Sequence, residues 1–144
     1  MSTVVIVAHH ERTEAAALAR HAADWLAERG HEAWMPAADA VALDLRDLAA
    51  ERRADDADLA LSLGGDGTML RAVRFLDGAA VPLLGVNLGV LGYLTEVEAP
   101  EMTNALDRFT KGSAGGEWYL DERLMLDVIA RSSVGASLGR WRAL

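Results

Sequence analysis

Hydrophobic residues along the chain fall into short apolar runs separated by stretches with helical spacing. Thr3–Ala8 and Leu59–Leu63 are continuous apolar runs, which is the pattern of strands buried on both faces of a parallel sheet. Further strands are predicted over Glu32–Met35, which Pro36 ends, and over Val81–Val86. Because strands alternate with helical segments, the sequence predicts an α/β fold with a Rossmann-like parallel sheet.

The segments between these runs carry apolar residues at steps of three and four. Ala15–Leu26 is predicted to form the first helix, with Gly30 as its C-terminal stop. Shorter helices are predicted around Val41–Leu48, over Thr68–Leu76 and over Met102–Phe109. The predicted order therefore places a helix between each pair of successive strands.

The pattern changes after the glycine-rich segment Lys111–Gly116. Apolar residues alternate from Leu124 to Ala130, Ser132–Ser137 is turn material, and Leu138–Leu144 is predicted to return as a second strand. We therefore expect one α/β domain over residues 1–114 and the first β-hairpin of an all-β domain over residues 115–144. The hairpin has an apolar face with no remaining sequence to cover it, so we expect this second domain to be truncated.

Composition narrows the class of protein further. A chain of 144 residues with 51% hydrophobic residues suits one soluble domain and excludes intrinsic disorder. No stretch is long and apolar enough to predict a membrane span, and no signal peptide is recognisable. The absence of cysteine excludes disulfide scaffolds and thiol chemistry and fits a cytoplasmic location. A net charge of −8 argues against nucleic acid as a partner.

The segment Gly64-Gly65-Asp66-Gly67-Thr68 joins a predicted strand to a predicted helix. Glycines at this position let backbone N–H groups approach a phosphate closely, and the helix N-terminus adds free donors. The segment is not a P-loop, because no lysine follows at the required spacing. We therefore expect Arg71 or Arg74 and a divalent cation to neutralise the phosphates, while no set of side chains with metal-ligand spacing is recognisable.

Each of these residues also has a structural interpretation. Asp66 and Thr68 are both suited to cap the helix, and Arg71 to be a solvated arginine on the helix surface. Asn87 suits a turn with left-handed backbone, and Tyr93 suits packing. A cap does not require three surrounding glycines, however, and this favours a ligand beside the Asp66 carboxylate. His9 and His10, at the end of the first strand, are candidates for a minor nucleotide contact.

Two blocks of sequence resemble the ATP–NAD kinase family. They are Leu63–Ala72, which contains the Gly-Gly-Asp-Gly-Thr segment, and Gly85–Thr95, and Asp121–Leu124 downstream is also similar. The resemblance runs from the first strand to the last residue and is loose over residues 1–57. Gly-Gly-Asp-Gly alone also occurs in phosphofructokinases and lipid kinases, so the second block carries the specificity.

The resemblance implies an enzyme that transfers the terminal phosphoryl group of ATP, or of polyphosphate, to the 2′-hydroxyl of the adenosine ribose of NAD, giving NADP. Asp66 would accept the proton of that hydroxyl, and Mg²⁺ is the divalent metal that this chemistry favours. The family pattern assigns the remaining binding positions to Gly64, Gly65, Gly67, Thr68, Arg71, Asn87 and Tyr93. Of these, Gly67 and Arg71 would contact the dinucleotide together with Asp66, and Gly64, Gly65 and Thr68 would border the phosphates.

The sequence also departs from the family. The second domain of the family supplies an Asn-acid pair and a Thr-Pro-Thr-Gly-Ser-Thr-Ala-Tyr segment, and neither occurs here. We therefore expect the chain alone to be nearly inactive. The resemblance implies that the full-length form is a homo-oligomer. The alternatives are a non-catalytic nucleotide-binding module and a diacylglycerol-type lipid kinase. The lipid kinases carry a glutamate shortly after the threonine, where this chain has Met69–Arg71.

Overall fold

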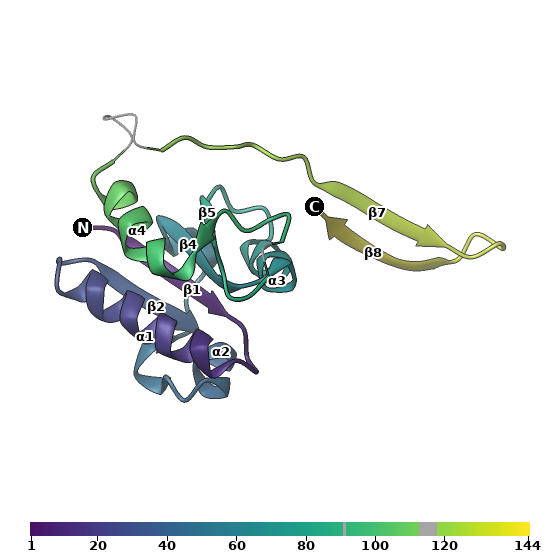
Figure 1. Cartoon of the computed structure of the whole chain (residues 1–144). Coiled ribbons are helices and arrows are strands. Elements are labelled where there is room, and N and C mark those ends of the chain that lie inside the picture. The colour runs from purple at the N-terminus through teal and green to yellow at the C-terminus, as the bar shows by residue number, and fades with distance from the viewer. Residues whose placement is uncertain (91, 113–117) are drawn as a thin grey trace.

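A sheet of six parallel strands runs through the N-terminal part of the chain (Figure 1). The computed structural model describes residues 1–90, 92–112 and 118–144. The strands lie in the order β3-β2-β1-β4-β5-β6. Their bounds are β1 Thr3–Ala8, β2 Glu32–Pro36, β3 Ala49–Ala50, β4 Leu59–Gly64, β5 Leu83–Asn87 and β6 Val97–Glu98. The predicted Rossmann-like α/β fold is confirmed.

The order of the strands reverses between β1 and β4. The chain fills the sheet on one side of β1 with β2 and β3, and then on the other side with β4, β5 and β6. Ala8 of β1 is in register with Leu63 of β4, and Gly64 of β4 with Asn87 of β5. The carboxyl ends of these three strands therefore meet at one edge, where open α/β sheets bind their ligands.

In the part of the chain that the structure describes, four α-helices and three short 3-10 helices connect the strands. The α-helices are α1 Thr13–Ala27, α2 Ala37–Ala42, α3 Asp66–Leu76 and α4 Met102–Thr110, and the 3-10 helices are η1 Arg46–Leu48, η2 Ala54–Asp56 and η3 Ala99–Glu101. The buried residues of α1 and α4 belong to one apolar cluster with β1 and β4, whereas Leu76 of α3 belongs to a second. Helices thus cover both faces of the sheet.

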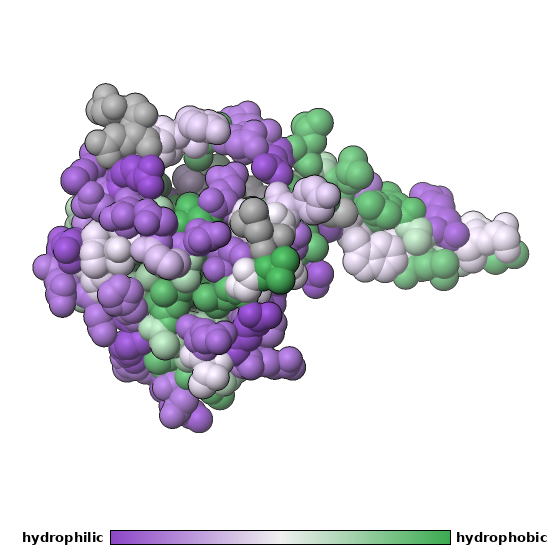
Figure 2. All heavy atoms as spheres, in the orientation of Figure 1, coloured by the Kyte–Doolittle hydropathy of each residue, from purple (hydrophilic) through white to green (hydrophobic). Residues whose placement is uncertain are grey.

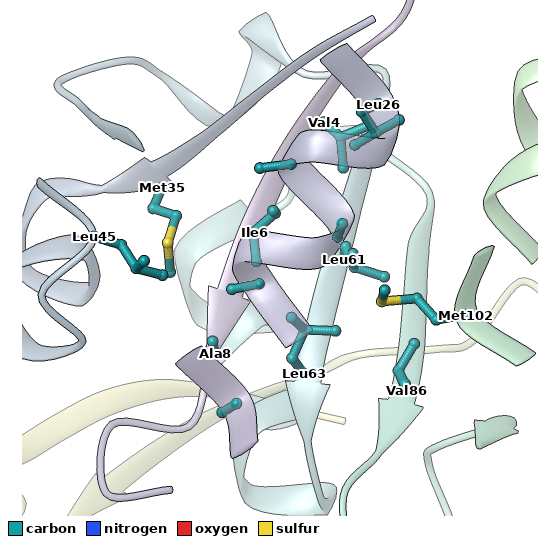
Figure 3. Packing of buried hydrophobic residues seen from close by; sticks show 14 of the residues in the cluster. Val4, Ile6, Ala8, Leu26, Met35, Leu45, Leu61, Leu63, Val86 and Met102 are labelled. Atoms are coloured by element: carbon teal, nitrogen blue, oxygen red, sulfur yellow. The ribbon is translucent and has the colours of Figure 1, made fainter. Parts of the chain in front are cut away.

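The central strands of the sheet are buried on both faces. In Figure 3, Val4, Ile6 and Leu61 lie beneath α1, and Met102 of α4 closes the same layer near Val86. The opposite face holds Val5, Ala60 and Trp34, whose ring meets Phe75 edge-on at 6.0 Å between centroids. Burial of both faces explains why these strands read as continuous apolar runs rather than as alternating ones.

Some predicted boundaries were wrong. The helix predicted around Val41–Leu48 begins earlier, at Ala37, and ends at Ala42, because Asp44 adopts left-handed backbone with φ of 56°. The strand predicted from Val81 begins only at Leu83. The two-residue strands β3 and β6 were not predicted, since so short a run carries no periodic signal.

The C-terminal residues form an antiparallel hairpin of β7 Leu126–Arg131 and β8 Ser137–Ala143. Figure 1 shows this hairpin projecting from the body that holds the parallel sheet. Its two strands are the all-β part of the described chain. The predicted boundary between residues 114 and 115 lies outside the described residues, so the division into two domains stays a prediction. Among the described helices, none has the length and apolar character needed to span a membrane.

Candidate functional site

A cavity of about 560 Å³ opens at the carboxyl ends of β1, β4 and β5. Three connections form it, one after each of these strands. The residues that line it are His9, His10, Glu11, Arg12, Gly65, Gly67, Thr68, Arg71, Asn87, Leu88 and Val90. The structure therefore brings Gly65, Gly67, Thr68, Arg71 and Asn87 of the predicted site together around one space.

The three glycines around the junction of β4 and α3 have different surroundings. Among the described residues, apart from chain neighbours and the helix's own backbone, nothing lies within 4 Å of the position that a Cβ would occupy on Gly65 or Gly67. A Cβ on Gly64 would instead lie 2.1 Å from Oγ1 of Thr68. Gly64 is therefore required by packing, whereas Gly65 and Gly67 leave room beside the first turn of α3. There the N–H of Thr68 donates to the carbonyl oxygen of Gly65 at 3.0 Å, and the N–H groups of Asp66 and Gly67 have no preceding helical turn to donate to.

Asp66 is the first residue of α3, and its carboxylate is held by the connection after β5. Oδ2 accepts a hydrogen bond from the backbone N–H of Tyr93 and Oδ1 from that of Leu94, each at 3.0 Å. These two bonds favour the ionised form and lower the pKa of Asp66. The side chain makes no cap hydrogen bond, and Gly65 is the N-cap residue, so the structure contradicts the capping interpretation of Asp66.

Gly92 is a further residue on which this arrangement depends. A Cβ on Gly92 would lie 2.2 Å from Oδ1 of Asp66, so a side chain at this position would displace the carboxylate. The sequence block Gly85–Thr95 contains this glycine, but its contact with Asp66 is not visible in the sequence because the two residues come from different connections.

Arg71 of α3 is held by three partners. Its Nη1 lies 2.7 Å from Oδ1 of Asp39 and 2.7 Å from Nε2 of His10, and its Nη2 donates to the carbonyl oxygen of Ala8. The structure therefore contradicts the interpretation of Arg71 as a solvated arginine on the helix surface. Arg74, the other arginine considered for charge neutralisation, lines a different cavity beside β8. Sequence reasoning missed Asp39, since nothing in its own segment marks it.

Cationic and basic side chains gather around the cavity. His9, His10, Arg12 and Arg71 line it, and Glu11 is the acidic residue among the lining residues. Arg12 also donates a hydrogen bond to the carbonyl oxygen of Leu88 and so joins the connections after β1 and β5. Two arginines and one glutamate line the cavity and Asp39 pairs with Arg71, so this edge is close to neutral in a chain of net charge −8, which suits an anionic ligand better than the rest of the chain does.

Asn87 and Tyr93 occupy different environments. Asn87 ends β5 with extended backbone, which contradicts the left-handed turn, and its Nδ2 donates to the carbonyl oxygen of Gly89 at 2.8 Å. Within the described structure its Oδ1 is buried and has no hydrogen-bond partner. The side chain of Tyr93 is 96% exposed and does not line the cavity, so it is not a packing aromatic.

The fold and the site together define a class of protein. An open parallel sheet that presents a glycine-rich turn, a helix N-terminus and basic side chains at its switch point is typical of α/β proteins that bind phosphorylated ligands. The family model for the ATP-NAD kinase N-terminal domain matches residues 4–114. The chain therefore belongs to the ATP–NAD kinase family.

Individual relatives agree with this assignment. The chain is 37% identical to the NAD kinase of Heliobacterium modesticaldum over 133 residues, which are 88% of this chain and 44% of that protein. It is 32% identical to the NAD kinase of Methanothermobacter thermautotrophicus over 139 residues, covering 96% of this chain and 48% of that one. The chain thus spans about half the length of these relatives.

A solved structure has the same fold. The crystal structure of yeast NADH kinase complexed with NADH superposes with a TM-score of 0.69 at 19% sequence identity. The superposition covers 99% of this chain and 46% of the yeast chain. The arrangement of strands and helices is therefore shared with a protein whose sequence is only distantly similar.

Proposed function

We propose that this chain forms the nucleotide-binding part of a NAD kinase that converts NAD to NADP. The terminal phosphoryl group of ATP or polyphosphate is transferred to the 2′-hydroxyl of the adenosine ribose. The bond from the terminal phosphorus to its bridging oxygen breaks, and a bond from the 2′-oxygen to that phosphorus forms. The observation that carries the proposal is the position of Asp66 between Gly65 and Gly67, whose bare backbone lines a cavity with basic walls.

Each residue has a role in this proposal. Asp66 accepts the hydroxyl proton, and the hydrogen bonds from the connection after β5 keep it ionised for that purpose. The backbone at Gly65 and Gly67 receives the phosphates, and Arg71 and Asn87 contact the dinucleotide. Phosphoryl transfer depends mainly on positioning and charge stabilisation, which fits a site made of backbone amides and basic side chains.

A divalent metal is the remaining component. The described residues contain no group of three or more histidine, aspartate or glutamate side chains that could hold a metal ion. Mg²⁺ commonly binds through one or two carboxylates together with the phosphate oxygens of a nucleotide, and Glu11 is the carboxylate that lines the cavity with Gly65 and Gly67. When bound, the metal would neutralise charge on the transferred phosphoryl group.

The substitution Asp66→Asn, which replaces the carboxylate by an amide, tests the proposal. In the full-length protein, Asp66→Asn is expected to abolish formation of NADP while the affinity for NAD changes only a few-fold, because the amide cannot accept the proton. Asp58→Asn is the matched control, since Asp58 also accepts a backbone hydrogen bond, from Thr3 at 2.8 Å, away from the cavity. Wild-type turnover in Asp66→Asn would refute the role.

Assays of the wild-type protein separate the alternative functions. Nucleotide binding without turnover in the wild type would favour the non-catalytic binding module, and phosphorylation of diacylglycerol would favour a lipid kinase. Parallel assays with ATP and polyphosphate identify the donor. The proposal also includes a cytoplasmic, homo-oligomeric full-length protein, and analytical ultracentrifugation tests the oligomeric part.

A further inference from the structure

Asp39 carries a buried carboxylate and is not among the site residues predicted from the sequence. It belongs to α2, and three groups from two other elements converge on it. Oδ1 lies 2.7 Å from Nη1 of Arg71 and 2.8 Å from Nε2 of His10, and Oδ2 lies 3.4 Å from the backbone nitrogen of Ala8, which donates to it. A buried carboxylate is costly unless it is paired, so these contacts are a built arrangement.

The same contacts fix the direction of the Arg71 guanidinium. A guanidinium has five N–H donors in one plane. Nη1 donates one to Oδ1 of Asp39, and Nη2 donates one to the carbonyl oxygen of Ala8. Nε2 of His10 lies 2.7 Å from Nη1 and 2.8 Å from Oδ1 of Asp39, and it either accepts from the first or donates to the second, as its tautomer decides. Among contacts within the described residues, this leaves the Nε hydrogen and one Nη2 hydrogen free. Arg71 lines the cavity with about a third of its side chain exposed, so a ligand can reach it.

We propose that Asp39 is a positioning residue that anchors Arg71 at the end of β1, with its two remaining donors directed at a phosphate group of a nucleotide in the cavity. The inference rests on the proposed function. A free arginine side chain loses conformational freedom when it binds a ligand, and an anchored one has already lost it. Asp39 thereby strengthens phosphate binding although it is itself an anion.

Because Asp39 is an anion, the direction in which its removal changes phosphate binding distinguishes two roles. If only the charge of Asp39 mattered, Asp39→Asn would tighten binding of a phosphate, because it removes a negative charge beside Arg71. If Asp39 positions Arg71, the same variant weakens binding. We expect Asp39→Asn in the full-length protein to raise KM for NAD or for ATP about tenfold and to change kcat by less than about threefold. The substrate whose KM rises identifies which phosphate Arg71 holds.

A double-mutant cycle shows whether Asp39 acts through Arg71. Arg71→Ala is expected to raise the same KM, and the Asp39→Asn, Arg71→Ala double variant is expected to show no further loss. Asp47→Asn is the matched control, because it removes a comparable pair with Arg20, at 2.6 and 2.7 Å, on an exposed surface away from the cavity. An unchanged or lowered KM in Asp39→Asn, or additive losses in the cycle, would overturn the inference.

A second measurement is independent of substrate binding. Labelling of arginines with phenylglyoxal, read by mass spectrometry, should be slow at Arg71 in the wild type and fast at Arg53, whose side chain is 83% exposed. In Asp39→Asn the rate at Arg71 should rise toward that of Arg53. An unchanged labelling rate at Arg71 in Asp39→Asn would overturn the anchoring of Arg71 by Asp39. A wild-type protein that binds neither NAD nor ATP would overturn the proposed function, and the labelling rate would still decide whether Asp39 anchors Arg71.

A further variant covers the case in which Asp39→Asn does not fold, as judged by circular dichroism. Arg71→Lys keeps the positive charge but has one nitrogen, which cannot reach three partners and still present two donors to a ligand. It should raise the same KM about tenfold. A wild-type KM in a folded Arg71→Lys protein would contradict the requirement for an anchored fork.

Discussion

At the scale of single residues, the chemistry of the site depends on how two carboxylates are held. Asp66 is fixed by two backbone N–H groups and has no ion-pair partner in the described part of the chain. Asp39 is buried and is fixed by the side chain of Arg71, which lines the cavity, and by the backbone N–H of Ala8. The first arrangement holds a carboxylate by backbone groups beside the cavity, which Asp66 itself does not line, and the second commits its carboxylate to another side chain.

The hydrogen bonds to Asp66 predict how the protein responds to acid. Because they lower the pKa of Asp66 in the folded state, their stabilisation is present above the ordinary pKa and is lost as the pH falls through the lowered value. The base therefore stays ionised when the pH is reduced from 7 to about 5, since ordinary aspartates titrate near 4. NMR titration of the Asp66 carboxyl measures this, and a titration of Asp66 within this range would contradict the prediction. A loss of kcat in this range that is the same in wild type and in Asp58→Asn shows only that Asp58 is not the group responsible.

At the scale of elements, the turn from β4 to α3 combines two kinds of glycine. Gly64 must be glycine because Thr68 is packed against it. Gly92, in the connection after β5, must also be glycine, because the Asp66 carboxylate is packed against it. Gly65 and Gly67 have no such neighbour, and the space beside them belongs to the cavity. Sequence alone shows a cluster of glycines, and only their surroundings separate those that serve packing from those that face a ligand.

This difference predicts opposite effects of the same substitution. Gly67→Ala lies in the first turn of α3 and is expected to keep or raise stability, by up to about 1 kcal/mol, while its methyl group weakens nucleotide binding. Gly64→Ala is expected to lower stability by about 1–3 kcal/mol, because buried Thr68 must move. Urea denaturation and calorimetric titration with NAD measure the two effects. Equal losses of stability in both variants would contradict the distinction.

At the scale of the whole molecule, the body and the hairpin differ in how they are stabilised. Both apolar clusters of the body are made of residues between Val4 and Phe109. The hairpin leaves large apolar side chains exposed, with Leu126 at 65% and Leu138 at 64%, and Figure 2 shows such residues along its projecting end. Its polar link to the body is through Arg142, which donates to the carbonyl oxygen of Asp77 at 3.0 Å.

We therefore expect the body to fold without the hairpin. A chain that ends after Tyr119 keeps the contact of Trp118 with Phe109 and should unfold within a few degrees of the 144-residue chain, because an exposed polar link contributes little. It should also bind less of a hydrophobic dye such as ANS. Leu61→Ala, which empties a fully buried position, is the destabilising reference at about 2–5 kcal/mol. A loss as large as that of Leu61→Ala in the shortened chain would contradict this expectation.

The sequence by itself determined the elements that depend on short-range patterns. The continuous apolar runs became β1 and β4, and the glycine turn with its following helix lies where it was predicted, because period and backbone freedom are local properties. The start of α2 was misjudged, since five of its six residues are alanine or valine and show no helical periodicity, and the helix is set by the neighbouring Pro36 and by the left-handed Asp44.

Only the tertiary structure decided which residues meet. The contacts of Asp39 with Arg71, of Gly92 with Asp66 and of Arg12 with Leu88 each join connections that follow different strands. They exist because the reversal of strand order brings the carboxyl ends of β1, β4 and β5 to one edge of the sheet. No pattern within a single segment encodes such a meeting, because it depends on the order of strands that lie far apart in the chain.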